Sequence, residues 1–346
     1  MKTPVRRATL SVTYNSANIT ADLAPMLLGF EYVDIVDGVN ADSMTLTVEN
    51  SDGRWFGEWL PERGATVTAT LTCHDWPGGK VLECGKFEID SINFAGVPNT
   101  CAISALAIGI TSSLRRERKT RAWENISISG IVGQVAGEHG FAVHFDSAKD
   151  PKIDRFDQRE QSDIEMLVEL CTRNGLVVRI SDKTLVVQEW VKLDSQPPVH
   201  TFERFGGECL GYRFQIDSSD TYSACEVQYI DPKERLLLTY RHEPGASEWS
   251  GKKPPSGYVL KDNRRCSCRA EAEILAKAAL REANKHEATG TIDNLGNPDL
   301  RAGLVASVKG WGKFDDGRYM MEQVRHRYDK QGGYEVSVDL RGVLDY

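Results

Sequence analysis

The sequence predicts an α+β fold that is predominantly β, with two antiparallel β-barrels and a small α+β module between them. Three observations carry this prediction. Most of the chain alternates apolar and polar residues between turn signals, helical patterns interrupt this near the middle, and one stretch near the start is closely repeated near the end. The predicted boundaries are residues 1–112 for the first barrel, 113–198 for the module and 199–346 for the second barrel.

The composition is that of an ordinary globular protein. The 346 residues suffice for two or three domains, and 40 % of them are hydrophobic and 27 % charged. The net charge of −8 argues against binding of nucleic acid through a broad basic surface. We find no apolar run of membrane-spanning length and expect no secretory signal. The eight cysteines lie mostly in apolar contexts, as reduced and partly buried thiols do.

Residues 5–112 read as strands separated by turns. RATLSVTYN, SMTLTVEN, ATVTATLTC, GKFEIDSINF and CAISAL each alternate, and Gly, Asn, Asp and Pro turns lie between them. This pattern is typical of an antiparallel barrel or sandwich. The segment WFGEWLPERG is expected to form a tight connection within it.

The middle of the chain changes in character. A cationic connector, SSLRRERKTRAW, precedes a helical pattern that Gly140 can end. In the next helical pattern Ser162 and Glu165 have the spacing of a capping box, and Gly175 is a natural helix end. LVVRISDKTLVVQEW then predicts a β-hairpin, and DSQPPVH is the expected linker to the second barrel.

From residue 199 onward the chain is mostly β again, with one predicted helix over 269–285. A repeat connects this segment with the first. GKFEIDSINFAGVPNTCAISAL is matched by GRYMMEQVRHRYDKQGGYEVSVDL, with Phe87 aligned to Tyr319 and, beyond the turn, Cys101 aligned to Tyr334. An internal duplication would give two similar barrels in one chain. The alternative is that any two β-meanders look alike, because all strands alternate.

Sequence signatures of catalysis are lacking. We find no G-x-S-x-G, H-E-x-x-H or Walker A motif, and no G-x-G-x-x-G after a strand. Cys266 and Cys268 lack the second ligand pair of a structural zinc site, which favours small strand residues leading into a helix. We predict no catalytic residue, cofactor or metal site, although a site assembled only in three dimensions stays open. Four further carboxylates lack the Gly and Glu of an EF-hand, which favours a solvated loop: Asp146, Asp150, Asp154 and Asp157.

The cationic connector could contact phosphate groups. The acidic balance of the chain, and the lack of interleaved aromatic residues beyond Trp123, favour a solvated face or an interface with acidic neighbours. Its cations are Arg115, Arg116, Arg118, Lys119 and Arg121.

Several long segments, in order along the chain, carry a family resemblance. Among them are ITADLAPMLLGFEYVD, ADSMTLTVENSDGRWFGEWLPERGATVTATL, CGKFEIDSINF, SSLRRERKTRAWEN, FDQREQSDIEMLVELC, AEAEILAKAALREANK and GNPDLRAGLVASVKGWGKFDDGRYMMEQVRHRYDKQGGYEVSVDLRGVL. They resemble the phage late control D family, the tail hub proteins of contractile-tailed phages related to P2. The resemblance spans essentially the whole chain. It extends to the hub of T4-like baseplates and to the N-terminal part of type VI secretion spike proteins.

The resemblance implies a structural, non-enzymatic role. A homotrimer with two tube-protein-like barrels per chain would present six barrels, and would act as a symmetry adaptor between the hexameric tail tube and a trimeric spike. The implied partners are the tail tube protein, a separate spike protein (because the chain ends just after the second barrel) and the tape measure protein. DNA is expected only as passing cargo, without membrane insertion. The implied location is the tail or baseplate of the virion, after assembly in the host cytoplasm.

Trp55, Phe56 and Trp59 are the candidate interface residues, because large aromatics in a turn-rich segment often anchor interfaces. Packing over a barrel end within the monomer is the alternative. Three other functions stay open. The first is the hub of a pyocin-like or other contractile injection particle. The second is a tail-associated peptidoglycan hydrolase, which would need a carboxylate pair or a zinc site. The third is a regulatory DNA-binding protein, for which we find no helix-turn-helix on a basic face.

Overall fold

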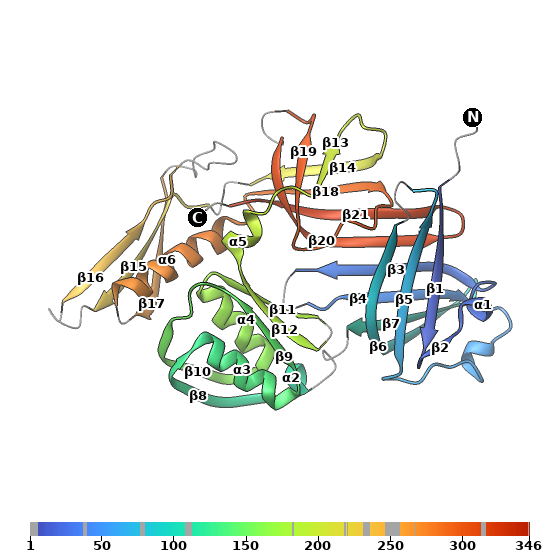
Figure 1. The fold of residues 1–346 in the computed structure, drawn as a ribbon, viewed down its shortest axis with the longest axis horizontal. Helices are drawn as coiled ribbons and strands as arrows, with labels where there is room; N and C mark the ends of the chain where they lie inside the picture. The colour runs from blue at the N-terminus through green and yellow to red at the C-terminus, as the bar shows by residue number, and fades with distance from the viewer. Residues whose placement is uncertain are drawn as a thin grey trace.

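A computed structural model of the protein describes residues 6–36, 40–76, 80–107, 113–181, 183–217, 219, 221–230, 236–245, 257–266, 268–312, 316–344 and 346. Its described elements are mostly strands, so the predominantly β, α+β class is confirmed (Figure 1). A sheet of thirteen strands dominates this part of the chain, beside sheets of two, three and three strands. No helix in these ranges combines the length and apolarity that crossing a membrane requires.

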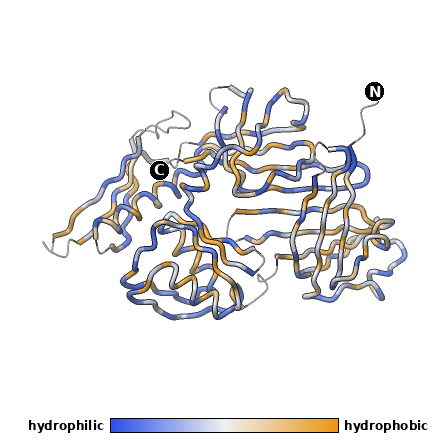
Figure 2. The backbone as a smooth tube through the Cα atoms, viewed as in Figure 1, coloured by the Kyte–Doolittle hydropathy of each residue, from blue (hydrophilic) through white to orange (hydrophobic). Residues whose placement is uncertain are grey.

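The N-terminal segment forms one half of the large sheet, in the hydrogen-bonded order β1-β5-β6-β7-β4-β3 with all neighbours antiparallel. Apolar residues alternate along these strands (Figure 2), which buries one face of each strand in a shared core. The elements are β1 (Arg7–Tyr14), β2 (Ala17–Asn18), α1 (Thr20–Leu23), β3 (Leu27–Ile35), β4 (Ser43–Glu49), the 3-10 turn η1 (Arg54–Phe56), β5 (Thr66–His74), β6 (Val81–Ala95) and β7 (Thr100–Ala107).

The C-terminal segment forms the other half of the sheet in the order β13-β19-β20-β21-β18-β14. If the six main strands of each half are numbered one to six in chain order, both halves have the same order across the sheet, which is 1-4-5-6-3-2. One ladder differs, since β13 runs parallel to β19 whereas β1 is antiparallel to β5. The strands are β13 (His200–Glu203), β14 (Cys209–Ile216), β18 (Ala288–Leu295), β19 (Val305–Lys309), β20 (Gly317–Asp329) and β21 (Gly333–Gly342).

Matching irregularities support an internal duplication. The ladder of the first hairpin shifts register at Asp90, and the ladder of the second shifts at the aligned residue, Glu322. A bulge at Leu28 in β3 is likewise matched by one at Leu210 in β14. Simple alternation does not create bulges at equivalent places, whereas bulges persist among related structures. The two halves are therefore related in topology and in local backbone detail, and we call them repeats below.

The predicted alignment was wrong beyond the turn of the repeated hairpin. Phe94 pairs with Cys101 in the first hairpin, whereas its counterpart His326 pairs with Val336 in the second. Cys101 therefore corresponds to Val336 and not to Tyr334. Cys101 comes seven positions after Phe94, whereas Val336 comes ten positions after His326, because the ladder of the second hairpin continues further before it turns.

The two repeats share one continuous sheet. β3 of the first repeat pairs with β20 of the second in antiparallel register, with Tyr32 opposite His326 (Figure 1). The pairing path runs from β14 at one end to β2 at the other. Closure of each repeat into a separate barrel thus remains a prediction.

The middle module has its own apolar core beneath its helices. The predicted helices and hairpin are confirmed, but two predictions were wrong. The cationic connector forms α2 and strand β8, and of the four carboxylates expected in a loop only Asp150 lies outside a strand, in the segment between β9 and β10. The elements are α2 (Ser113–Arg116), β8 (Arg118–Ser127), α3 (Ile128–His139), β9 (Ala142–Asp146), β10 (Lys152–Ser162), α4 (Asp163–Arg173), β11 (Leu176–Ser181), β12 (Thr184–Glu189) and α5 (Trp190–Asp194).

The helix ends follow the local sequence. Ser162 and Glu165 form the predicted capping box, in which each side chain bonds the other's backbone N–H. Gly140 and Gly175 have φ of 69° and 71° just beyond α3 and α4, a backbone conformation that glycine adopts without strain. These caps fix where each helix ends before the next strand.

A third unit, absent from our prediction, lies between β14 and β18. A small sheet of β15 (Ala224–Ile230), β16 (Leu237–His242) and β17 (Val259–Cys266) packs against α6 (Arg269–Asn284) around its own apolar cluster. The helix was predicted, over 269–285, but the unit was not. In Figure 1 it projects on the side away from the first repeat.

Candidate interaction surfaces

The three predicted aromatic residues divide into buried and exposed. Trp55 is buried in the core of the first repeat and meets Trp59 edge to face, with 5.5 Å between ring centroids. Trp59 is half-buried against the same core. Phe56 is 60 % exposed, and its ring lies 4.5 Å from that of Phe94, which is also exposed. Trp55 thus packs within the monomer, and Phe56 is available to a partner.

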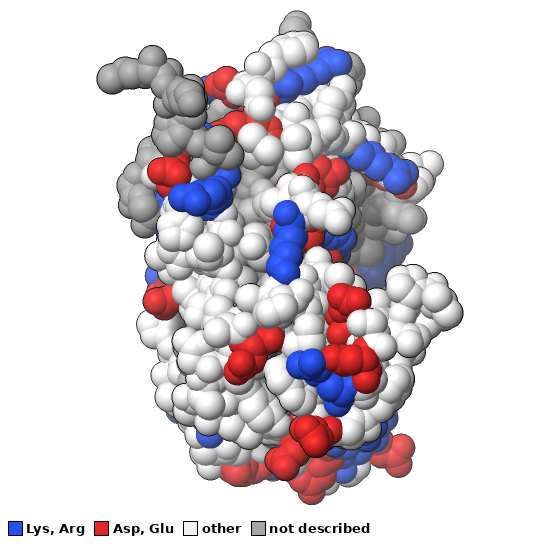
Figure 3. All heavy atoms as spheres, turned by 90° about the vertical axis from the view of Figure 1, so that its right-hand side faces the viewer, with Lys and Arg blue, Asp and Glu red and all other residues white. Residues whose placement is uncertain are grey.

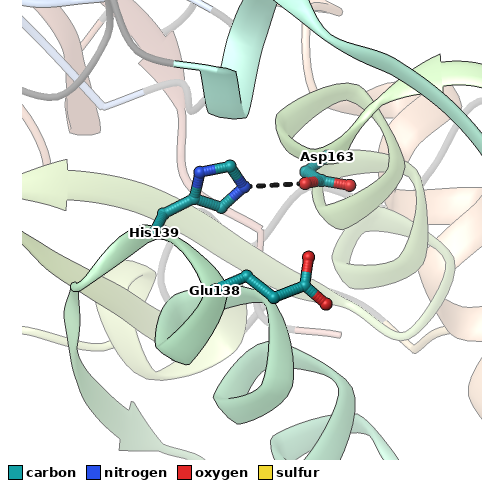
Figure 4. Close-up of side chains that lie close together, drawn as sticks. All are labelled: Glu138, His139 and Asp163. Carbon is teal, nitrogen blue, oxygen red and sulfur yellow. Dashed lines mark hydrogen bonds and ion pairs between the residues drawn. The ribbon is translucent and has the colours of Figure 1, made fainter.

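A cluster of Glu138, His139 and Asp163 has the composition of a metal site (Figure 4). His139, at the end of α3, points its Nε2 at Asp163 Oδ2, 2.8 Å away. The same carboxylate also accepts bonds from Lys119 Nζ at 2.8 Å and Arg121 Nη2 at 2.9 Å. Two cationic side chains therefore already occupy the space beside the carboxylates that a metal ion would need.

The electrostatics of this cluster fit a structural ion network. Burial acts to raise the pKa of Asp163, but hydrogen bonds from Lys119, His139 and Gln158 outweigh it and hold that pKa below its usual range. The carboxylate is therefore ionised and neutralised by its neighbours. The network ties β8 to α3 and α4, and on the other side of the imidazole Ser113 Oγ lies 3.0 Å from His139 Nδ1.

The cationic stretch mostly binds partners within the chain. Besides Lys119 and Arg121, Arg118 donates to the backbone oxygen of Glu160 at 2.9 Å, and Arg116 lies 3.9 Å from Asp90. The interpretation as a surface with acidic neighbours therefore fits better than a phosphate site. Figure 3, which looks onto the end of the first repeat, shows Lys and Arg interspersed with Asp and Glu, without a continuous basic patch on that face.

The remaining sequence candidates do not converge on a site. Asp146 pairs with Lys192, Asp150 accepts from Ser129 N, and Asp157 pairs with two arginines, so three of the four carboxylates have separate partners. Cys266 is buried, and burial raises its thiol pKa to about 11, while Cys268 is exposed.

Exposed apolar residues gather at one end of the large sheet. β14 pairs with β18 along one edge, and the described residues place no strand along its other edge. Leu210, Tyr212 and Ile216 of this strand are all exposed. The sequence analysis missed this surface and Phe94, because alternation alone cannot show which strand lacks a neighbour.

Comparison with known proteins supports the expected resemblance. No family model matches the chain. It is 24 % identical to a probable baseplate hub protein of Escherichia phage 186 over 96 % of this chain and 93 % of that protein. It is also 24 % identical to a probable baseplate hub protein of Escherichia phage P2, over 64 % of this chain and 56 % of that protein. The resemblance to phage tail hub proteins is thereby confirmed.

Solved structures share the fold. A tail protein from Neisseria meningitidis has a TM-score of 0.68 at 14 % identity, over 97 % of this chain and 96 % of that one. A 43 kDa tail protein of prophage MuSo2 from Shewanella oneidensis has a TM-score of 0.70 at 10 % identity, over 96 % and 98 %. A component of the E. coli type VI secretion system has a TM-score of 0.56 at 12 % identity, over 91 % and 73 %.

Proposed function

We propose that this chain is the baseplate hub protein of a contractile phage tail, with a structural and non-enzymatic role. The observation that carries the proposal is the duplicated repeat in a chain that resembles hub proteins over nearly its whole length. The ion pairs of Asp163 with Lys119 and Arg121, which are typical of a structural network, support the non-enzymatic role.

The finer role we propose is that of a trimeric symmetry adaptor. Three chains with two related repeats each would present six similar units to the tail tube and three inserted units elsewhere. The partners would be a hexameric tube protein, a trimeric spike and the tape measure protein, and DNA would pass without specific contact. The repeats would act as the tube-like barrels, with the middle module between them, in a virion assembled in the host cytoplasm.

A hub from a DNA-free injection particle is the second candidate. The fold shared with a component of the E. coli type VI secretion system supports this second candidate, since the same architecture is found outside phage tails. The identity of the neighbouring genes distinguishes the two: capsid and packaging genes indicate a phage, and their absence beside a complete tail cluster indicates an injection particle.

The proposal is tested by negative-stain electron microscopy of the purified chain at high concentration, with mass determination in parallel. A ring of three chains with six lobes around a hole is the expected result. If the chain alone is monomeric, co-expression with the spike protein encoded beside it should yield the ring. A chain that stays monomeric with both spike and tube protein contradicts the adaptor role.

A further inference from the structure

A cavity opens at the end of the first repeat, beside α1 and η1. It encloses about 400 Å³, a volume that can hold a small ligand or a large side chain. Figure 1 places α1 at the end of the repeat that lies farthest from the middle module. The floor of the cavity is formed by core residues of five strands, Val12, Leu46, Val67, Ile89 and Ile103. A floor of this kind favours an apolar occupant.

Two tryptophans form one wall of the cavity. Trp55 is 4 % exposed, and its Nε1–H has no acceptor among the described residues. Buried donors are normally paired, so an occupant with a carbonyl oxygen beside its apolar group would supply the missing acceptor. Trp59 is only half-buried, so this wall can adjust to an occupant.

The backbone of this wall is held in place without a partner. The N–H of Trp55 donates to Asn50 Oδ1 at 3.2 Å, and the N–H of Glu62 donates to the hydroxyl oxygen of Tyr14 at 3.1 Å. Tyr14 belongs to β1, so the segment that carries both tryptophans is tied to the sheet at the cavity. A pre-formed wall lowers the entropy cost of binding.

Three carboxylates surround the cavity without counter-charges. Asp22, Glu58 and Glu62 are exposed, and the part of the chain that the structure describes offers their carboxylates neither a hydrogen bond nor an ion pair. Leu60, which also lines the cavity, is 48 % exposed. Unneutralised negative charge around an apolar opening favours an occupant that carries a cation beside its apolar group.

We propose that this cavity binds a segment of a partner protein in which one large apolar side chain is flanked by lysine or arginine. The apolar side chain enters the cavity, its backbone carbonyl accepts from Trp55, and its basic neighbours face the three carboxylates. A cation is already accommodated beside this wall, since the guanidinium of Arg54 lies 4.9 Å from the ring centroid of Trp59, with its charge paired to Asp52. The proposal goes beyond the hub role and does not depend on it.

A peptide segment fits the cavity better than a free organic cation does. Every side chain of a peptide has a backbone carbonyl next to it, which matches a buried donor beside an apolar floor. An alkylammonium ion has no acceptor and would leave the Nε1–H of Trp55 unpaired. A nucleic acid is disfavoured as well, because its phosphates would meet the three carboxylates.

Short peptides test the chemistry of the occupant. The probes are acetyl-Lys-Leu-Lys-amide, acetyl-Lys-Ser-Lys-amide and acetyl-Glu-Leu-Glu-amide, with butylammonium chloride as the free cation. Binding is followed by fluorine NMR of the chain labelled with fluorinated tryptophan, and Trp→Phe variants assign the resonances of Trp55 and Trp59. The Lys-Leu-Lys peptide should shift both resonances and bind at least about tenfold more tightly than the other three probes.

Variants around the cavity test the site itself. Glu58→Lys combined with Glu62→Lys should weaken binding of the Lys-Leu-Lys peptide at least about tenfold, because attraction becomes repulsion. The matched control, Glu117→Lys with Glu335→Lys, makes the same change in net charge at two exposed residues away from the cavity and should bind as wild type does. Leu60→Lys places a cation beside the carboxylates within the chain and should also abolish binding. Circular dichroism checks that all variants are folded.

Several outcomes would overturn the proposal. They include equal binding of the Lys-Ser-Lys or Glu-Leu-Glu peptide, unchanged binding by the Glu58→Lys and Glu62→Lys variant, and the absence of any shift at millimolar Lys-Leu-Lys. Butylammonium that binds as tightly as Lys-Leu-Lys would assign the cavity to a free cation, and loss of self-association in sedimentation of Leu60→Lys would assign it to a second copy of this chain. Because peptide binding is measured on the chain alone, its failure leaves the hub role standing.

Discussion

Asp194 holds three parts of the molecule together, and its loss should be costly. Its carboxylate, at the end of α5, is fully buried and accepts bonds from Arg281 Nη1 at 2.6 Å and from Arg341 Nη2 at 3.0 Å. The backbone N–H of Leu344 adds a bond at 3.1 Å. The middle module, α6 and β21 therefore meet at one acidic side chain.

Replacing Asp194 with Ala leaves two buried guanidinium groups without their shared counter-charge. Removing one partner of a buried ion pair costs about 3–5 kcal/mol. We expect a value near the lower end, because Arg341 also contacts Glu322 at 3.2 Å. With a urea dependence of about 1–3 kcal/mol/M, the unfolding midpoint should fall by about 1–3 M.

The assay is urea unfolding followed by circular dichroism, with Glu124→Ala as the control. Glu124 pairs with Arg155 at the surface, where both side chains are about 60 % exposed, and such pairs are worth about 0–1 kcal/mol. Asp194→Asn keeps the shape but not the charge and should lie between wild type and Asp194→Ala. A loss below about 1 kcal/mol for Asp194→Ala would refute the view that this ion pair joins the units.

Three further changes have predictable effects, each measured by urea unfolding. Ser162→Ala should cost about 1 kcal/mol, because the N-terminal cap of α4 is lost; an unchanged midpoint contradicts this. Burial lowers the pKa of His326 to about 3, so the contribution of neutral His326 to the free energy of unfolding is present above the ordinary pKa of about 6.5 and is lost as pH falls toward 3. His326→Phe should therefore lose less stability over that range than wild type does. Parallel curves of stability against pH for the two proteins contradict this. Burial, and then the charge of Asp34, raise the pKa of Asp42 to about 7, so the contribution of the protonated carboxyl to the free energy of unfolding is present below about pH 4 and is lost as pH rises to 7. The stability of Asp42→Asn should therefore rise relative to that of wild type between pH 4 and 8. A difference in stability that stays constant over this range contradicts this.

Alternation and capping predicted much of the architecture from the sequence. Strands β1, β4, β5, β6 and β7 of the first repeat, both long helices of the middle module and α6 were found, because period and cap residues are local properties. Strand β3, which joins the two repeats, was not among the predicted strands. β8 was missed because its charged residues suggested a solvated connector. In the fold, Lys119 and Arg121 are held by Asp163, which lies more than forty residues further along the chain.

Long-range pairing explains the remaining errors. Period-two alternation fits equally well when a strand slides by two residues, so the sequence could not decide whether Cys101 matches Tyr334 or Val336. Among the aromatic candidates, Trp55 and Phe56 are adjacent in sequence but lie in the core and on the surface respectively. Only the fold places Phe56 of η1 beside Phe94 of β6, where both side chains are exposed.

The covalent linkage of the two repeats restricts the number of repeats that a closed ring can contain. Any closed ring made from this chain contains an even number of repeats, so rings of five or seven cannot form even though a head-to-tail contact between single repeats would allow them. The unit formed by β15, β16, β17 and α6 is inserted in the second repeat alone, so it occurs at every other position of such a ring. Around such a ring the repeats therefore recur twice as often as the inserted units do. The number of repeats is even whatever the number of chains, because each chain supplies two.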